Sequence, residues 1–248
     1  HGQIRRQRQM CIRDRAAVLA GRGSKSLTIA IESGSERMRR VVNKKLSGEE
    51  IEAAARHAKQ GGLKALKLYG MVGLPCEDND DVESTAALLL SLKKGTPGLR
   101  FTLGVSTFVP KAHTPFQWQG VRPEAEKRLK LLAKRLKPKG IDLRPESYGW
   151  SVIQALLSRS DRRLAPVIAA VRGSQESLGG WKKAYRAALA GELPEARSAG
   201  VVLPLPPSWE SVVHDEWASD TVLPWCHLDG PLSQEKLQEH RQEALNLG

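Results

Sequence analysis

The 248-residue sequence has few cysteines and no long apolar run. Its three cysteines, at positions 11, 76 and 226, are odd in number and far apart, which argues against a disulfide framework. No apolar stretch approaches the roughly 18 residues that a membrane span needs, and the first residues lack the apolar core of a secretory signal. We therefore expect a cytoplasmic protein that makes no contact with a membrane.

Acidic residues are scarce beside basic ones, with 27 Asp and Glu against 39 Lys and Arg. The first fifteen residues, HGQIRRQRQMCIRDR, hold five arginines and one aspartate and show neither helical nor strand periodicity. The string resembles translated sequencing-adapter read-through, so residues 1–15 are predicted to be a non-native or disordered tail, with the true protein extending upstream of about Ala16. The alternative is a basic arm that binds nucleic acid, although such arms are usually longer and more densely charged.

Between residues 16 and 118 the sequence alternates between strand and helix patterns. The apolar run SLTIAI (26–31) predicts a strand covered on both faces, as in a parallel sheet. Ser35 is a predicted N-cap, and Ser47 with Glu50 forms a capping-box pattern. Further predicted segments are strands at 64–73 and 99–110 and helices at 35–42, 48–59 and 78–94. This order predicts an α/β fold whose parallel sheet is either open or closed into a barrel.

Polar and glycine residues cluster where each predicted strand ends. Ligands of such folds bind at the carboxyl ends of the strands, where loops and helix N-termini converge. A carboxylate such as Glu32 accepts hydrogen bonds from a ribose diol or an ammonium group, and glycines let a ligand approach the backbone. The alternative is that Glu32 only begins a helix and pairs with Arg37 or Arg39 in solvent.

Three motifs carry a family resemblance: LTIAIESGSERMRRVVNK, KLYGMVGLPCED and VSTFVPKAHTPFQW, in this order. Together they resemble the second half of the catalytic barrel of radical S-adenosylmethionine (SAM) enzymes, in particular the uncharacterised subgroup that carries an N-terminal cobalamin-binding domain. The resemblance implies that residues 16–144 form the C-terminal half of a partial TIM-type barrel. Residues 145–248 would then form a small helical C-terminal extension.

The resemblance also implies a SAM site and its chemistry. A 4Fe-4S cluster, reduced by a flavodoxin or ferredoxin, would cleave SAM and yield a 5'-deoxyadenosyl radical that abstracts hydrogen from an unknown substrate; cobalamin is a further cofactor expected of the full-length protein. By this resemblance the segment after the first strand would contact the ribose or methionyl group of SAM. The segment after the second strand would contact the adenine, and the segment after the third strand would close the pocket. The predicted contact residues are, after the first, second and third strand in turn, Glu32, Ser33 and Gly34; Met71, Val72 and Gly73; and Phe108, Val109 and Pro110.

The sequence departs from that family at the metal ligands. The Cys-x3-Cys-x2-Cys loop that holds the cluster does not occur, and the glycine-rich segment that usually meets the SAM amino group is also missing. We therefore expect this polypeptide to bind no cluster by itself and to be an inactive fragment of an enzyme. Cys226, His227, Asp229 and His214 lack the usual spacing of zinc ligands, so no metal site is predicted.

A strongly basic amphipathic helix is predicted at 122–140. Its apolar face comprises Ala125, Leu129, Leu132, Ala133 and Leu136, and its outer face comprises Lys127, Arg128, Lys130, Lys134, Arg135, Lys137 and Lys139. Such a face is more often simply solvated, and no aromatic stacking platform accompanies it. The alternative function is therefore a non-catalytic RNA-binding module that uses this helix to contact phosphates.

Overall fold

The structure is a computed structural model that describes residues 15–172, 176–193 and 208–248. The chain forms two compact units. Unit 1 comprises the chain up to Ser106 together with Glu126–Glu146 and Ala244–Gly248, and unit 2 comprises Thr107–Ala125 and Ser147–Glu243. The predicted tail, apart from Arg15, lies outside the described residues, and the predicted domain boundaries stay predictions.

Unit 1 is built on a four-stranded sheet with the order β1-β2-β3-β4. β1 pairs with β2, and β3 with β4, in parallel register, which confirms the predicted α/β class with a parallel sheet. Closure of the sheet into a barrel stays a prediction. The strands are β1 (Ser26–Glu32), β2 (Ala65–Val72), β3 (Arg100–Thr107) and β4 (Asp142–Pro145).

The fourth strand was not predicted from the sequence. It spans four residues, and only Leu143 among them is buried, so its sequence carries almost no apolar pattern. Its pairing with Thr102–Val105 of β3 identifies it as a strand.

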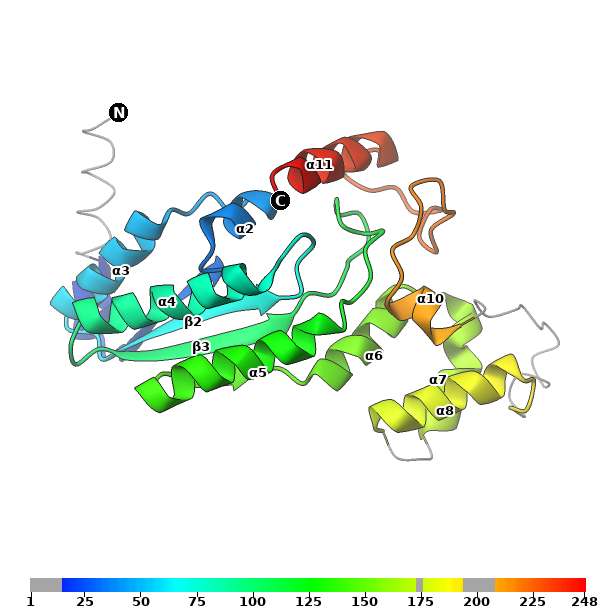
Figure 1. The fold of residues 1–248 in the computed structure, drawn as a ribbon, viewed down its shortest axis with the longest axis horizontal. Coiled ribbons are helices and arrows are strands. Elements are labelled where there is room, and N and C mark those ends of the chain that lie inside the picture. The colour runs from blue at the N-terminus through cyan, green and yellow to red at the C-terminus, as the bar shows by residue number, and fades with distance from the viewer. Residues whose placement is uncertain (1–14, 173–175, 194–207) are drawn as a thin grey trace. The chain divides into compact units, whose positions relative to one another are not determined.

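The helices of unit 1 begin where their capping residues predict. The Ser35 side chain accepts a hydrogen bond from the Met38 N–H, and Ser47 and Glu50 form a complete capping box. Asp78 caps the next helix and forms a capping box with Asp81. Residues 15–21 are also helical, and the further helices are α2 (Glu36–Val41), α3 (Gly48–Gln60), α4 (Asn79–Gly95) and α5 (Glu124–Leu136, of which residues from Glu126 belong to unit 1), followed by a 3-10 turn at Lys137–Lys139 (Figure 1).

The two faces of the sheet differ in burial. In β2, Leu66 and Leu68 are fully buried, whereas Lys67 and Tyr69, which alternate with them, are exposed. β1 departs from the prediction of a strand covered on both faces, because Thr28 and Ala30 are exposed. Among the described residues, only one face of the sheet is well covered. We refer to the other as the open face, and its residues include Lys67, Tyr69, Thr102 and Gly104.

Unit 2 is helical and packs around aromatic side chains. Tyr185 and Trp209 meet edge to face with ring centroids 5.7 Å apart, in a core that also contains Val152, Leu156 and Val167. Its helices are α6 (Tyr148–Ser158), α7 (Ala165–Arg172), α8 (Leu178–Leu189), α10 (Trp209–Val213) and α11 (Gln234–Asn246, which extends beyond Glu243), with a 3-10 turn at Arg162–Leu164. None of the helices in the described part of the chain is both long and apolar enough to span a membrane.

Candidate ligand-binding site at the carboxyl ends of the strands

Glu32 ends β1 in a conformation that non-glycine residues rarely adopt. Its φ is 62°, and the register of β1 against β2 shifts between Ala30 and Glu32, which marks a bulge. The carboxylate is partly exposed and pairs with Lys44 at 3.1 Å, not with Arg37 or Arg39. Backbone strain at the end of a strand is typical of functional positions, so Glu32 is the best ligand candidate in unit 1.

Ser33 and Gly34 pack against α4. The Ser33 hydroxyl lies 3.4 Å from that of Thr85 and accepts a hydrogen bond from the Ser35 N–H. A Cβ atom at Gly34 would lie 2.2 Å from the Cα of Thr85, so the loop approaches the helix more closely than a side chain permits. Ser33 and Gly34, two of the predicted SAM contacts, therefore hold the loop after β1 against α4.

A buried arginine holds the same loop from the other side. Arg39 is 2% exposed and donates hydrogen bonds to the carbonyl oxygens of Ser33 and Gly34, both at 2.9 Å, and of Leu46 at 2.8 Å. Burial lowers the pKa of Arg39, partly offset by the charge of Glu36. The arginine satisfies three carbonyl groups and thereby fixes the segment that follows Glu32.

The N-terminus of α4 joins this loop to the one after β2. The carboxylate of Asp81 accepts a hydrogen bond from the Ser35 hydroxyl at 2.6 Å and pairs with Arg37. Arg37 also donates to the Cys76 carbonyl at 3.1 Å. Burial alone would raise the pKa of Asp81, but the hydrogen bonds from Ser35, the Asp78 N–H and Arg37 outweigh it and hold the pKa below its ordinary value.

The loop after β2 is organised by Glu77. Its carboxylate accepts hydrogen bonds from the Gly73 N–H at 2.6 Å and from Arg128 of α5 at 2.9 Å. Arg128 also donates to the Glu77 carbonyl at 2.6 Å. Burial raises the pKa of Glu77 to about 7, although the Gly73 N–H and Arg128 favour the ionised form.

The three predicted adenine contacts have different environments. Met71 is half-buried, whereas Val72 is 2% exposed. Gly73 is buried with φ at 79°, and its N–H is already bonded to Glu77. Of the three, Met71 alone retains accessible side-chain surface for a flat apolar ligand.

The segment after β3 belongs to unit 2. Phe108 meets Phe116 edge to face at 6.1 Å, and Val109 packs against the main hydrophobic cluster of unit 2. The Pro110 carbonyl accepts a hydrogen bond from the Ser158 hydroxyl at 3.3 Å. The role of these residues in closing a SAM pocket stays a prediction. Before them, the buried hydroxyl of Thr107 has no hydrogen-bond partner among the described residues.

A shallow pocket of about 160 Å³ lies on the open face of the sheet. The Tyr69 ring covers Gly104, because a Cβ atom there would lie 2.7 Å from the ring. Lys67, Arg144 and Glu146 supply charged groups to the same pocket. Sequence analysis missed this pocket, since an alternating strand pattern does not reveal which face stays uncovered.

The cysteines do not fit a 4Fe-4S cluster. Cys11 lies outside the described residues, Cys76 is half-buried in unit 1, and Cys226 is exposed in unit 2. In the described part of the chain, no three His, Cys, Asp or Glu side chains gather as a metal site requires. A cluster needs thiolate ligands, and the expectation that this chain binds no cluster by itself stays a prediction.

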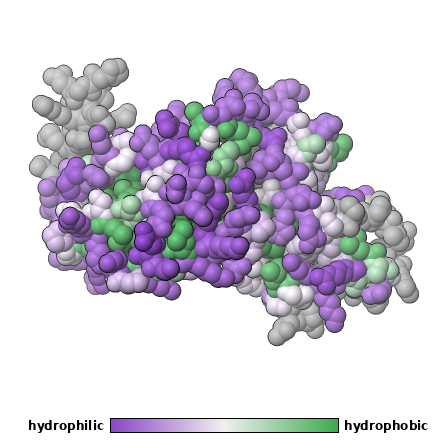
Figure 2. Space-filling model, viewed as in Figure 1, coloured by the Kyte–Doolittle hydropathy of each residue, from purple (hydrophilic) through white to green (hydrophobic). Residues whose placement is uncertain are grey.

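The outer face of α5 is less basic than predicted. Arg128 was assigned to it but is buried against Glu77, because its guanidinium reaches the loop after β2. Lys130 pairs with Glu126, and Arg135 pairs with Glu83. Figure 2 shows hydrophilic side chains over most of the face on which α4 and α5 are seen. RNA binding by this helix stays a prediction.

Comparison with known proteins bears on this part of the chain. The sequence model of the radical SAM superfamily matches residues 6–89. The matched segment begins inside the predicted tail and runs through β1 and β2 into α4, so it includes Glu32 and Met71. An uncharacterized protein of Methanocaldococcus jannaschii is 35% identical over 141 residues, which is 57% of this chain. The match covers 31% of that relative, so this chain spans about a third of its length.

Four residues of the site were not predicted in the roles that they have: Arg39, Asp81, Thr85 and Arg128. Three of them act on a partner in another segment of the chain, such as Arg128 on Glu77, 51 residues away, whereas Arg39 bonds to carbonyl groups five to seven residues away. The sequence pattern partly predicted the position of Asp81, because acidic residues are favoured in the first turn of a helix. No such pattern marked the other three.

Proposed function

We propose that this chain is part of a radical SAM enzyme and that unit 1 supplies the C-terminal strands of its TIM-type barrel. The superfamily match over residues 6–89, the parallel sheet and the clustering of polar groups at the strand ends support the proposal. The single observation that carries it is Glu32, which lies within the matched segment in a strained conformation with a partly exposed carboxylate.

In this proposal Glu32 accepts hydrogen bonds from the ribose or ammonium group of SAM, and its pair with Lys44 positions the carboxylate. Met71 offers apolar surface to the adenine. Ser33, Gly34, Val72 and Gly73 shape the loops instead of meeting the ligand through free polar groups. That Phe108, Val109 and Pro110 would also contact SAM stays a prediction from the family resemblance.

The proposal places the cluster ligands outside this chain, because its cysteines do not fit a cluster. When bound, SAM and a cluster supply one-electron chemistry that starts with hydrogen abstraction. The full-length enzyme would work in the cytoplasm with a flavodoxin or ferredoxin as reductant, and a cobalamin-binding domain would precede the barrel. The open face, with Lys67 and Tyr69, would line the chamber in which an unidentified substrate is held.

The first test is to read the source DNA upstream of the codon for Ala16. We expect the reading frame to continue into a Cys-x3-Cys-x2-Cys motif. The protein encoded by the whole frame should then bind iron and SAM, measured by metal analysis and calorimetry. A frame without the three cysteines contradicts the enzyme proposal.

The site assignment has its own test in that protein. Glu32→Gln should weaken SAM binding about tenfold without changing the iron content, as expected for loss of one charge-assisted hydrogen bond. Glu36→Gln is the matched control, since Glu36 is exposed in the first turn of α2 and should have no effect. Equal SAM affinity in the Glu32→Gln variant and the wild type removes Glu32 from the site.

A further inference from the structure

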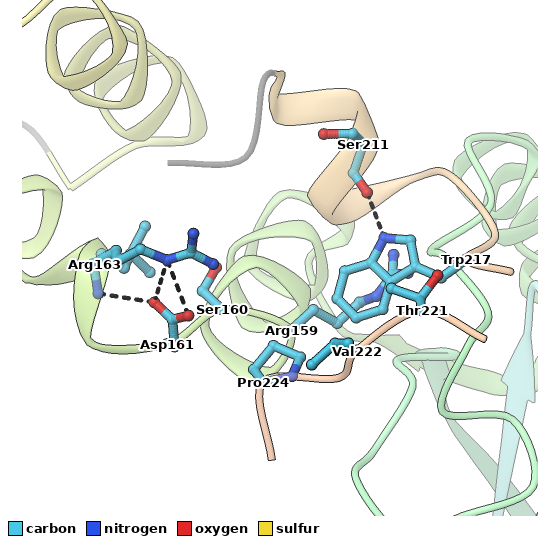
Figure 3. Close-up of a pocket in the computed structure, with 10 residues that line it drawn as sticks. Arg159, Ser160, Asp161, Arg163, Ser211, Trp217, Thr221, Val222 and Pro224 are labelled. Atoms are coloured by element: carbon cyan, nitrogen blue, oxygen red, sulfur yellow. Dashed lines mark hydrogen bonds and ion pairs between the residues drawn. The ribbon is translucent and has the colours of Figure 1, made fainter. Parts of the chain in front are cut away.

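A pocket inside unit 2 contains a buried arginine. The pocket has a volume of about 230 Å³, and all of its lining residues belong to unit 2. Arg159 follows α6, and Trp217, Val222 and Pro224 come from the segment between α10 and α11 (Figure 3). The pocket therefore joins two stretches of chain about sixty residues apart in a part of the protein to which the family match does not extend.

Arg159 uses only part of its hydrogen-bonding capacity. The residue is 1% exposed. Its Nη2 group donates to the carbonyl oxygens of Asp215 at 3.0 Å and of Trp118 at 3.5 Å, whereas Nε and Nη1 have no partner among the described residues. The guanidinium carbon lies 3.8 Å from the centroid of the Trp217 ring, so stacking fixes its plane and leaves its edges as donors.

The charge of Arg159 is not neutralised by an ion pair with any residue that the structure describes. Burial lowers the pKa of Arg159 to about 10, opposed by the charge of Asp215, so the group remains protonated at neutral pH. Buried donors without an acceptor destabilise a fold, and a native protein rarely keeps several in one place without a reason. An anionic ligand would satisfy both the charge and the donors.

The groups beside Arg159 favour the same kind of ligand. The Ser160 hydroxyl is buried and has no partner among the described residues. Asp161, the one carboxylate among the described residues of the pocket, is engaged by Arg163 through contacts of 2.8 and 3.0 Å, which Figure 3 shows as dashed lines. An adjoining hollow of about 750 Å³ adds Arg162 and His227.

The remaining walls are largely apolar. Leu164, Trp217, Val222 and Pro224 surround the cationic group with hydrocarbon and aromatic surface. A cavity of this size is smaller than the roughly 300 to 1,000 Å³ of a drug-sized site. It fits a small molecule, or the end of a larger one that extends into the adjoining hollow.

We propose that this pocket binds the oxyanion of a small organic molecule that carries an apolar group. Arg159 would donate from Nε and Nη1, Ser160 would donate from its hydroxyl, and Trp217 with Val222 would cover the apolar part. The oxyanion belongs to either a carboxylate or a phosphate monoester, whose shared chemistry is an anionic oxygen that accepts several hydrogen bonds. The inference does not depend on the proposed radical SAM function.

The test measures the binding of four probe molecules to the 248-residue chain by calorimetry. The probes are phenylacetate, phenyl phosphate, inorganic phosphate and the neutral phenylacetamide. We expect one of the two aromatic anions to bind at least about tenfold more tightly than phenylacetamide, since only an anion pairs with Arg159. Tighter binding of phenylacetate identifies a carboxylate ligand, and tighter binding of phenyl phosphate identifies a phosphate monoester. The NMR signal of the Arg159 Nε–H should shift on binding.

Variants locate the binding in the pocket. Arg159→Met should abolish it, and Arg186→Met on α8 should leave it unchanged. Ser160→Ala should weaken it several-fold, and Val222→Trp should block the pocket. These two variants carry the test if Arg159→Met fails to fold, because Ser160 Oγ has no partner to lose among the described residues and Val222 is 81% exposed.

Three results would overturn the proposal. One is that neither aromatic anion binds at concentrations up to about 10 mM. Another is that phenylacetamide binds as tightly as the anions, which would leave only an apolar pocket. The third is that Ser160→Ala and Val222→Trp bind the anions as the wild type does.

Discussion

The guanidinium of Arg128 and the carboxylate of Glu77 form a buried ion pair at 2.9 Å. The side chains are 8% and 2% exposed, so both charges have left water. Glu77 holds the Gly73 N–H, and Arg128 joins α5 to the loop after β2. The pair thus fixes one side of the proposed SAM site.

Removing one partner of this pair should destabilise unit 1. We expect Arg128→Met to lower the free energy of unfolding by about 3 kcal/mol above pH 7, where Glu77 is ionised in the folded chain, because it leaves a buried carboxylate without its cation. Denaturant unfolding followed by circular dichroism measures the change. Lys130→Met is the control, since its pair with Glu126 is exposed, and it should cost less than about 1 kcal/mol. Equal losses in both variants would contradict a buried pair.

The raised pKa of Glu77 predicts a pH dependence of stability. The folded chain binds this proton more tightly than the unfolded chain, so the stabilising contribution is complete below the ordinary glutamate pKa and is lost as the pH rises to about 7. The loss amounts to about 3 kcal/mol between roughly pH 4.5 and pH 7. Measured against pH, the unfolding free energy of Glu77→Gln should lack this decline. If the unfolding free energy of the variant and of the wild type declined in parallel with rising pH, Glu77 would be excluded as the source of the decline.

Gly34 should not tolerate a side chain. A Cβ atom there would lie 2.2 Å from the Cα of Thr85, so Gly34→Ala must push the loop away from α4. We expect a loss of about 3 kcal/mol and faster hydrogen exchange at the amides of α4. Gly95→Ala at the end of α4 is the control, because nothing lies within 4 Å of its Cβ position. The control should be as stable as the wild type or slightly more stable.

The side chain at position 32 should lower the stability of the fold but strengthen ligand binding. Its φ of 62° costs a non-glycine residue about 1 kcal/mol or more, and glycine relieves that strain while adding some entropy to the unfolded chain. Glu32→Gly should therefore keep or slightly raise the melting temperature of the protein and weaken SAM binding in the proposed full-length enzyme. A marked fall in melting temperature would show that Glu32 serves the fold through its pair with Lys44.

The carboxyl-end residues could be predicted from the sequence only as a group. Where strands end follows from the chain itself, so Glu32, Met71 and Gly73 were placed at the correct end of the sheet. Which of the carboxyl-end residues keeps a polar group available for a ligand depends on partners from distant segments of the chain. Thr85 occupies the space beside Ser33, and Glu77 takes the Gly73 N–H, and neither contact has a sequence signal.

The sequence by itself determined the local elements of this protein. Capping side chains and apolar periodicity act within a few residues, so the starts of α2 and α3 and the three longer strands follow from neighbouring residues. Only the tertiary structure decided which charged side chains are buried. Arg128 was predicted to be a surface cation and nothing in the sequence singled out Arg159, because the burial of both depends on acceptors and aromatic rings brought together from distant segments. For the same reason β4, with little apolar pattern of its own, became a strand only by pairing with β3.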